Sequence, residues 1–245
     1  MKNQLLIGCL SGWMLFSFVP QTLGQAEKPA IAIWKFEEIN SVIVDSSGNG
    51  NNGKLVNEKN AKRILGKSGK ALAFTPETKK NGCAVIPGIT AKYGFFAKGI
   101  TIEAWIKMNN SFKRPLTYEI VSNSNGGKGF RLLISWAKLC FRSGGGGKEG
   151  KTWQASSNSS THQIKPEIWY HIAAVYNGSV FKVYLDGELV GKSEKDLILS
   201  PGIKDLYIGA YGNGSANGFD GVIDEVRIYD YPRTDLQILQ DAKIE

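Results

Sequence analysis

The chain alternates apolar and polar side chains with a period of two residues along much of its length. Residues 101–107 (Thr-Ile-Glu-Ala-Trp-Ile-Lys) alternate most cleanly, and similar segments are bounded by Gly, Asn and Asp. Successive side chains of a strand point to opposite faces, so this pattern predicts β-strands packed against a core. Strands are expected at residues 31–36, 71–74, 83–86, 100–107, 119–122, 130–136, 139–142, 152–155, 170–176, 180–185, 188–192, 206–208 and 221–229.

Two dipeptides predict the turns between three of these strands. Asn177-Gly178 separates the strands at 170–176 and 180–185, and Asp186-Gly187 connects the latter to 188–192. Asp-Gly suits a two-residue hairpin because a type I′ turn requires positive φ at both central residues. Only residues 235–242 resemble a helix. Strands at short spacing without intervening helices predict an all-β fold, a two-sheet antiparallel β-sandwich (jelly roll) with a short C-terminal helix.

The first 24 residues predict a secretory signal peptide. One Lys precedes an apolar run at residues 5–19, and Pro20 and small residues follow it. The run of about 15 residues is shorter than the roughly 20 that span a bilayer. We therefore expect residues 25–245 to form one domain that is secreted or extracytoplasmic, in the periplasm or at the cell surface. In 245 residues, 30 Lys and Arg stand against 22 Asp and Glu, and loss of Lys2 with the signal leaves a net charge of +7.

Export determines how the cysteines are interpreted. Cys9 lies in the signal, which leaves Cys83 and Cys140 as an even pair in an oxidising compartment. A disulfide between them is one interpretation. The other is two buried thiols that act as small hydrophobic side chains on their strands.

Five blocks, in order and spacing, resemble the LamG-like jelly-roll domain of the concanavalin A-like lectin/glucanase superfamily. They are Trp-Lys-Phe-Glu-Glu with the Asp-Ser-Ser-Gly-Asn-Gly-Asn-Asn-Gly loop (34–38 and 45–53), 66–74, 101–106, 169–176 with 183–187, and 218–230. The resemblance covers residues 30–244. It implies a jelly roll, a fold that hosts lectins, adhesion modules, glycosidases and lyases, and so does not choose among these functions.

The loop at 45–53 is rich in oxygen-bearing side chains, which are the ligands that Ca²⁺ prefers. Asp224 is in phase with apolar residues of its strand, so alternation predicts a buried carboxylate that needs a partner. Similar domains hold a structural calcium between the two segments. The resemblance thus implies Asp45, Asn49, Asn51 and Asp224 as calcium ligands. The alternative is a cluster of Asx turns without metal, with Asp224 paired to a basic side chain.

Aromatic rings and guanidinium groups are the candidates for a ligand site. Sugar sites combine aromatic faces with a few polar groups. Trp105 and Trp169 fall in the shared blocks and are expected in the core. Trp136 and Trp153 lie outside those blocks, and Arg131 and Arg142 are near them in sequence. These four residues are the predicted ligand-binding set, with the arginines suited to carboxylate or sulfate groups.

Catalytic motifs are weak in this chain. It has two histidines, and the carboxylates at 224–230 do not match the Glu-x-Asp-x-x-Glu of similar glycosidases. We therefore expect, without excluding an enzyme, a secreted lectin-like module that holds a structural calcium and binds an extracellular polysaccharide, for which the positive net charge favours an anionic one. An adhesion or scaffold module that binds a surface protein is the alternative, and a polysaccharide lyase or glycosidase is third. Export and the dispersed lysines argue against nucleic acid, and no membrane span is expected in the mature chain.

Overall fold

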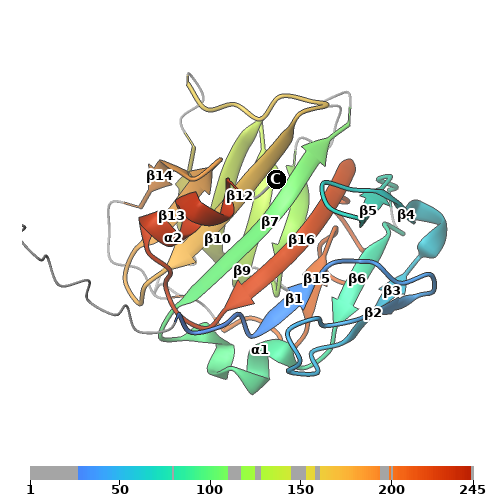
Figure 1. Cartoon of the computed structure of the whole chain (residues 1–245), viewed down its shortest axis with the longest axis horizontal. Coiled ribbons are helices and arrows are strands. Elements are labelled where there is room, and N and C mark those ends of the chain that lie inside the picture. The colour runs from blue at the N-terminus through green and yellow to red at the C-terminus, as the bar shows by residue number, and fades with distance from the viewer. Residues whose placement is uncertain are drawn as a thin grey trace, which may run out of the picture.

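The strands form two antiparallel sheets stacked face to face. In this computed structural model the described residues are 27–78, 80–109, 117–124, 128–144, 153–157, 161–193, 199 and 201–243. The predicted segment 1–24 lies outside them. Figure 1 shows the two layers with the C-terminal helix in front of one of them. The predicted two-sheet antiparallel sandwich with a short C-terminal helix is confirmed.

The first sheet, sheet A, runs in the order β14-β13-β12-β7-β16-β5-β4, with β1 paired to β16. Its long central strands β7 and β16 pair over most of their length, and β12 pairs with β7 on the other side. The strands are β1 (Ala32–Trp34), β4 (Ala61–Leu65), β5 (Lys70–Phe74), β7 (Ile100–Met108), β12 (Trp169–Tyr176), β13 (Phe181–Leu185), β14 (Glu188–Lys192) and β16 (Gly221–Tyr229).

The second sheet, sheet B, runs in the order β11-β10-β9-β8-β15-β6-β3-β2. Its strands are β2 (Val42–Ile43), β3 (Gly53–Val56), β6 (Cys83–Ile86), β8 (Thr117–Ser122), β9 (Gly129–Ser135), β10 (Lys138–Gly144), β11 (Trp153–Ser156) and β15 (Leu206–Ile208). Strands β2, β3 and β4 were not predicted, because they are short and carry few buried apolar residues.

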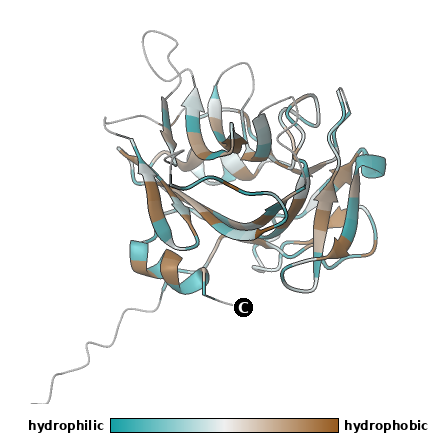
Figure 2. Cartoon of the chain, turned by 90° about the horizontal axis from the view of Figure 1, so that it is seen from above, coloured by the Kyte–Doolittle hydropathy of each residue, from teal (hydrophilic) through white to brown (hydrophobic). Residues whose placement is uncertain are grey.

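The core lies between the sheets and consists of alternate residues of each strand. Ile102, Ala104 and Ile106 of β7 face Leu132 and Ile134 of β9 across one continuous cluster. Seen from above, the strands change between apolar and polar along their length (Figure 2), as expected when only one face of a sheet is buried. The described residues also contain four short helices: η1 (Glu58–Asn60), α1 (Ile89–Lys92), η2 (Gly94–Phe96) and α2 (Asp235–Asp241).

The predicted C-terminal helix packs on the outside of sheet A. Its Ile238 is fully buried against Ala173, Val175 and Tyr184, which point outward from β12 and β13. Thr234 begins the helix with a capping box, in which its hydroxyl accepts the Gln237 N–H and the Gln237 side chain accepts the Thr234 N–H. The predicted Asp186-Gly187 hairpin is also confirmed, with φ of 49° and 82° at its two residues.

Asp224 lies next to an interruption of the alternation. The register of β16 on β7 shifts between Asp224 and Arg227, and Glu225 has φ of 47°. Ile223 before this bulge and Val226 after it both reach the core. Asp224 is opposite Trp105, outside the core cluster. It is fully buried, as expected, but the bulge places it on the outer face of sheet A.

No helix among the described residues is long and apolar enough to cross a membrane.

Candidate functional site

Trp136 lies at the tip of the β9–β10 hairpin and is 67% exposed. It and Ala137 form a two-residue turn with φ of 53° and 61°. This geometry suits Asn-Gly, and a non-glycine residue in the left-handed region costs about 1–2 kcal/mol. A large apolar ring is thus presented to solvent on a turn that its own backbone preference disfavours. Strain of this kind is concentrated at functional sites.

The loop after residue 160 supports this turn from the side of sheet A. The Ile164 N–H donates to the Ala137 carbonyl at 2.9 Å, and the buried Ile164 side chain anchors the loop in the core. Ile168 of the same loop is 45% exposed. We call the surface of Trp136, Ala137, Ile168, Trp169 and Lys107 the Trp136 end. Both sheets contribute to it, because β7 and β9 end here and β10 and β12 begin here.

Trp105 and Trp169 are not in the core, so that prediction is wrong. Both rings are half buried on the outer face of sheet A. The Lys67 ammonium lies 4.6 Å from the Trp105 ring centre, and Lys107 lies 5.3 Å from that of Trp169. The alternation of β7 explains the arrangement, since Trp105 shares its face with Lys107 and not with Ile106. Each tryptophan thus has a cation over its ring.

Arg131 and Arg142 lie next to each other, at a distance from Trp136. They are direct cross-strand neighbours on the outer face of sheet B. Arg131 precedes Trp136 by five positions along β9, which is about 16 Å. Trp153 lies in β11 opposite Ser143, and its side chain is outside the described part of the structure.

Arg131 is engaged with a buried acid. Its Nε and Nη2 donate to the Glu119 carboxylate at 3.0 and 2.6 Å, and the Tyr211 ring lies 5.0 Å from the guanidinium carbon. Burial lowers the pKa of Arg131, but the hydrogen bonds and charge of Glu119 outweigh it and raise that pKa above its usual value. Arg142 donates to the Gln154 side chain at 2.8 Å. The charge of Arg131 is therefore neutralised within the protein.

The predicted calcium loop is held together by Asp45. The Asp45 carboxylate accepts the N–H groups of Ile33, Ser47 and Asn51 at 2.9–3.0 Å. Burial opposes the charge, but these hydrogen bonds outweigh it and hold the pKa of Asp45 below its usual value. Asn49 and Asn51 donate to the Ile31 carbonyl. Asp45, Asn49 and Asn51 therefore form one network of turns.

Asp224 belongs to a different network. One of its oxygens accepts the N–H groups of Lys67 and Ser68 at 2.9 and 3.0 Å, and the other accepts that of Glu225 at 2.7 Å. No hydrogen bond within the described residues joins it to Asp45, nor do those residues contain a group of three acidic, His or Cys side chains that could hold a metal. The four predicted ligands are thus held in two separate hydrogen-bond networks, and calcium remains a prediction of the resemblance.

The buried Asp224 predicts a pH effect on stability. Burial raises its pKa to about 6, against the hydrogen bonds from Ser68, Glu225 and Lys67. The folded state then binds a proton more readily than the unfolded state, so this group favours folding below about pH 4 and loses that contribution as pH rises through 6. We expect the difference in unfolding free energy between the wild type and Asp224→Asn to change by about 2–3 kcal/mol between pH 4 and pH 7. Urea unfolding of both proteins measures it, and a constant difference would contradict the shifted pKa.

Cys83 and Cys140 are free, buried thiols, so the disulfide interpretation is wrong. They lie on β6 and β10, with β15, β8 and β9 between these strands. Four strand spacings amount to about 19 Å, and a disulfide requires Cα atoms within about 7 Å. Burial raises the pKa of Cys83 to about 12, as expected for an inert thiol.

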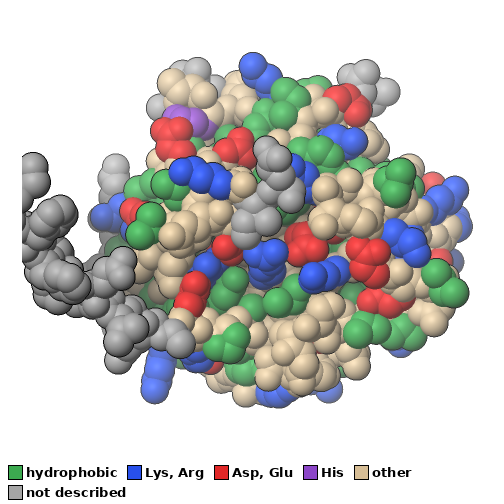
Figure 3. Space-filling view, viewed as in Figure 1, with side chains coloured by type: hydrophobic (Ala, Val, Ile, Leu, Met, Phe, Trp, Pro, Cys, Tyr) green, Lys and Arg blue, Asp and Glu red, His purple; other side chains and the backbone are tan. Residues whose placement is uncertain are grey.

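A charged network covers the outer face of sheet A beside α2. Arg233 is 3% exposed and lies between Glu103, at 2.5 Å, and Asp241, also at 2.5 Å. His171 Nε2 lies 3.2 Å from the other Glu103 oxygen. Acidic and basic side chains alternate across the middle of this face (Figure 3). Because the network joins β7, β12 and α2, we assign it to structure, although it contains one of the two histidines.

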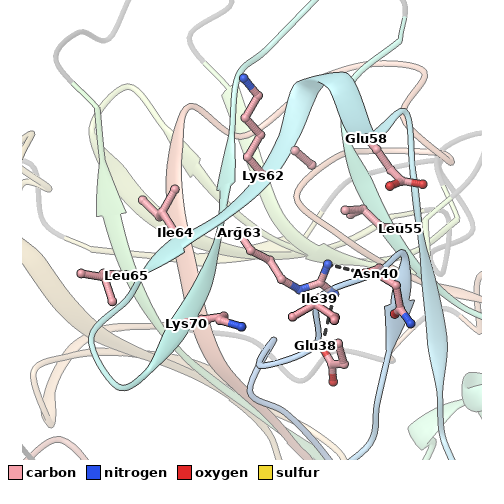
Figure 4. Close-up of a pocket in the computed structure, with 11 residues that line it drawn as sticks. Glu38, Ile39, Asn40, Leu55, Glu58, Lys62, Arg63, Ile64, Leu65 and Lys70 are labelled. Atoms are coloured by element: carbon pink, nitrogen blue, oxygen red, sulfur yellow. Dashed lines mark hydrogen bonds and ion pairs between the residues drawn. The ribbon is translucent and has the colours of Figure 1, made fainter.

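The two long sides of the sandwich differ. One side is closed, because β11 contacts β13 and β14. On the other side, an open groove of about 560 Å³ is lined by the edge strand β4 and by residues 38–40, which precede β2 (Figure 4). Ile39 and Leu65 line it and are 92% and 86% exposed. The Arg63 guanidinium, which also lines the groove, donates to the backbone carbonyls of Phe36 and Val42 and so connects β4 to this segment. The lining contains no aromatic residue.

Comparison with known proteins identifies the family and the fold. A family model described as "Concanavalin A-like lectin/glucanases superfamily" matches residues 87–239, and no curated protein matches the chain. The binding domain of Paraclostridial Mosquitocidal Protein 1 superposes with a TM-score of 0.68 and 18% identity, over 87% of this chain and 51% of that one. The binding domain of Botulinum Neurotoxin DC, solved in complex with SialylT, gives 0.64 and 15%, over 87% and 50%.

A third solved structure has a similar length. Domain 4 of AbnA, an extracellular arabinanase from Geobacillus stearothermophilus, solved in complex with arabinotriose, superposes with a TM-score of 0.59 and 19% identity, over 87% of this chain and 98% of that domain. This chain spans about half the length of the two toxin domains. At these identities the likeness establishes the fold alone.

Proposed function

Because this chain belongs to the concanavalin A-like lectin/glucanases superfamily, we propose that it is a non-catalytic module that binds carbohydrate at the Trp136 end. The observation that carries the proposal is the exposed Trp136 ring on a strained turn. An exposed indole can cover the apolar face of a sugar ring. The backbone strain at this position is understandable if the ring is kept there for a ligand.

The relatives are consistent with this proposal. Two of the similar domains were solved with SialylT and with arabinotriose bound. They show that this sandwich can present a carbohydrate site. They do not place the site on this chain, where the assignment depends on Trp136.

We propose an anionic polysaccharide outside the cell as the ligand. The Lys107 ammonium lies over the Trp169 ring at the Trp136 end, and the chain after the proposed signal peptide has a net charge of +7. Arg131 contributes no free charge, because Glu119 neutralises it. The signal-like residues 1–24 support secretion. Binding of an anionic glycan should weaken with rising salt, whereas binding of a neutral glycan should not.

Substitution of Trp136 tests the site. On an array of neutral and acidic glycans, the mature chain should bind a subset, and titration calorimetry with the best binder should show a tenfold to hundredfold weaker affinity for Trp136→Asn, since a central aromatic contributes about 1–3 kcal/mol. Asn suits the left-handed turn. The melting temperature should therefore not fall, which separates loss of binding from loss of folding.

Leu236→Asn provides the matched control. Leu236 is also a large exposed apolar residue, at 63%, but it lies on α2 away from the hairpin. Its substitution should leave affinity unchanged. Equal affinity of Trp136→Asn and the wild type would move the site elsewhere, with Trp153 the next residue to substitute. Release of reducing or unsaturated ends from the bound polysaccharide would instead identify a glycosidase or lyase.

A protein-binding function is the second candidate, and the groove lined by β4 and residues 38–40 favours it. Ile39, Ile64 and Leu65 expose aliphatic side chains there, next to a free strand edge. Such patches suit apolar side chains of a protein better than sugars. If no glycan binds and a surface protein does, Leu65→Lys should abolish the binding while Trp136→Asn preserves it.

A further inference from the structure

A lysine reaches into the loop in which the resemblance implies a calcium ion. Lys92 is the last residue of α1, and its ammonium lies 3.0 Å from the Asn49 carbonyl and 3.0 Å from Asn51 Oδ1. A carbonyl and an amide oxygen are ligands of the kind that a hard cation accepts. Two oxygens of the predicted calcium set therefore already face a positive charge that the chain itself supplies.

The loop is built so that these oxygens point toward Lys92. The Asn51 Nδ2 donates to the Ile31 carbonyl at 2.6 Å, which directs its Oδ1 the other way. The Asn51 N–H donates to Asp45 at 2.9 Å, and its carbonyl accepts the indole N–H of Trp34, also at 2.9 Å. Asn51 is 6% exposed and has little freedom to rotate. The orientation of Oδ1 is thus set by the buried side of the loop.

Asp45, the acidic residue of this loop, does not require a metal ion. Both oxygens of Asp45 accept backbone N–H groups, one from Asn51 and the other from Ile33 and Ser47. A carboxylate that accepts three such bonds is stable in its charged form without a cation. Asp224, the other predicted carboxylate ligand, is held by residues 67 and 68.

We propose that the Lys92 ammonium is the resident cation of the loop at 45–53 and fastens it to α1 in place of a metal ion. The ammonium is a compact charge with three donors, and it satisfies two of them on the loop. It also lies 5.3 Å from the ring of Tyr93. The loop follows β2 and precedes β3, so this contact fixes one end of the groove-side edge of sheet B.

Thermal unfolding with and without metal tests the proposal. The melting temperature of the wild type should be the same in EDTA and in millimolar calcium chloride, and elemental analysis of the purified protein should find no stoichiometric calcium. Lys92→Met keeps the aliphatic stem and removes the charge. It should lower the melting temperature by about 2–4 °C, the effect of one charge-assisted contact in a domain of this size.

Lys98→Met is the matched control, because Lys98 is also an exposed lysine and lies after η2, outside the loop at 45–53. It should melt as the wild type does, and Lys92→Arg should retain most of the wild-type melting temperature. A wild type that loses stability in EDTA and regains it with calcium would overturn the proposal. Equal melting of Lys92→Met and Lys98→Met would overturn it as well.

Discussion

Replacement of Arg233 by methionine should destabilise the folded chain by about 3–5 kcal/mol, the usual effect of leaving a buried charge without its partner. Arg233 donates to Glu27, Glu103 and Asp241, and its guanidinium lies 4.4 Å from the Tyr229 ring centre. Glu103 is 1% exposed and would keep only His171. Urea unfolding at pH 7 measures this loss of unfolding free energy. In thermal unfolding the same loss should lower the melting temperature by roughly 10 °C.

Two variants separate this explanation from a loss of packing. Glu103→Gln in the Arg233→Met background removes the stranded charge and should restore part of the stability. Arg227→Met removes a guanidinium that also contacts Asp241 but is 22% exposed, so it should cost less. If Arg227→Met and Arg233→Met are equally destabilised, burial of the charge is not the cause.

The strands of this fold were largely predictable from the sequence. Alternation identified β7 because every second residue of this long strand enters the core, and it identified β16 on either side of its bulge. The same alternation predicts that Trp105 points away from the core, because it shares its face of β7 with Glu103 and Lys107. The assignment of Trp105 to the core was wrong because it followed the family blocks and not the alternation.

The edge strands and the bulge could not be predicted in the same way. Strand β4 reads Ala-Lys-Arg-Ile-Leu and buries only its first residue, so it has no periodicity to detect. The bulge at Asp224 depends on the turn at residues 66–68, which supplies two N–H donors from 156 and 157 positions away. A partner that distant leaves no local signal at residue 224.

The candidate site was predictable only in part. Trp136 is exposed, as a ligand residue must be, and the Trp-Ala turn contains no Gly, Asn or Asp to mark it in the sequence. Arg131 and Arg142 were expected close to Trp136 in one ligand set, and the sequence does not reveal that Arg131 is paired with the buried Glu119. Whether Arg131 can bind a ligand depends on Glu119, which lies on the neighbouring strand β8. The register between β8 and β9 brings the two residues together, and this register is a property of the folded sheet.

The Arg131–Glu119 pair yields the second large effect. Glu119 is fully buried, and three contacts from Arg131 satisfy its carboxylate. Arg131→Met should therefore cost about 3–5 kcal/mol at pH 7, because an unpaired carboxylate remains in the interior. Burial raises the pKa of Glu119 and Arg131 lowers it. Loss of Arg131 raises it further, so the destabilisation should shrink as pH falls and the acid becomes protonated.

A double-mutant cycle shows whether Arg131 serves the fold or a ligand. Arg131→Met with Glu119→Gln should be more stable than Arg131→Met alone, since the buried charge is gone. Arg142→Met, which breaks a contact to the exposed Gln154, should change stability by less than about 1 kcal/mol. If the double variant folds and still binds an anionic glycan with wild-type affinity, Arg131 is structural. If it folds and binds tenfold more weakly, Arg131 contacts the ligand, and the site extends from Trp136 along β9 to the outer face of sheet B.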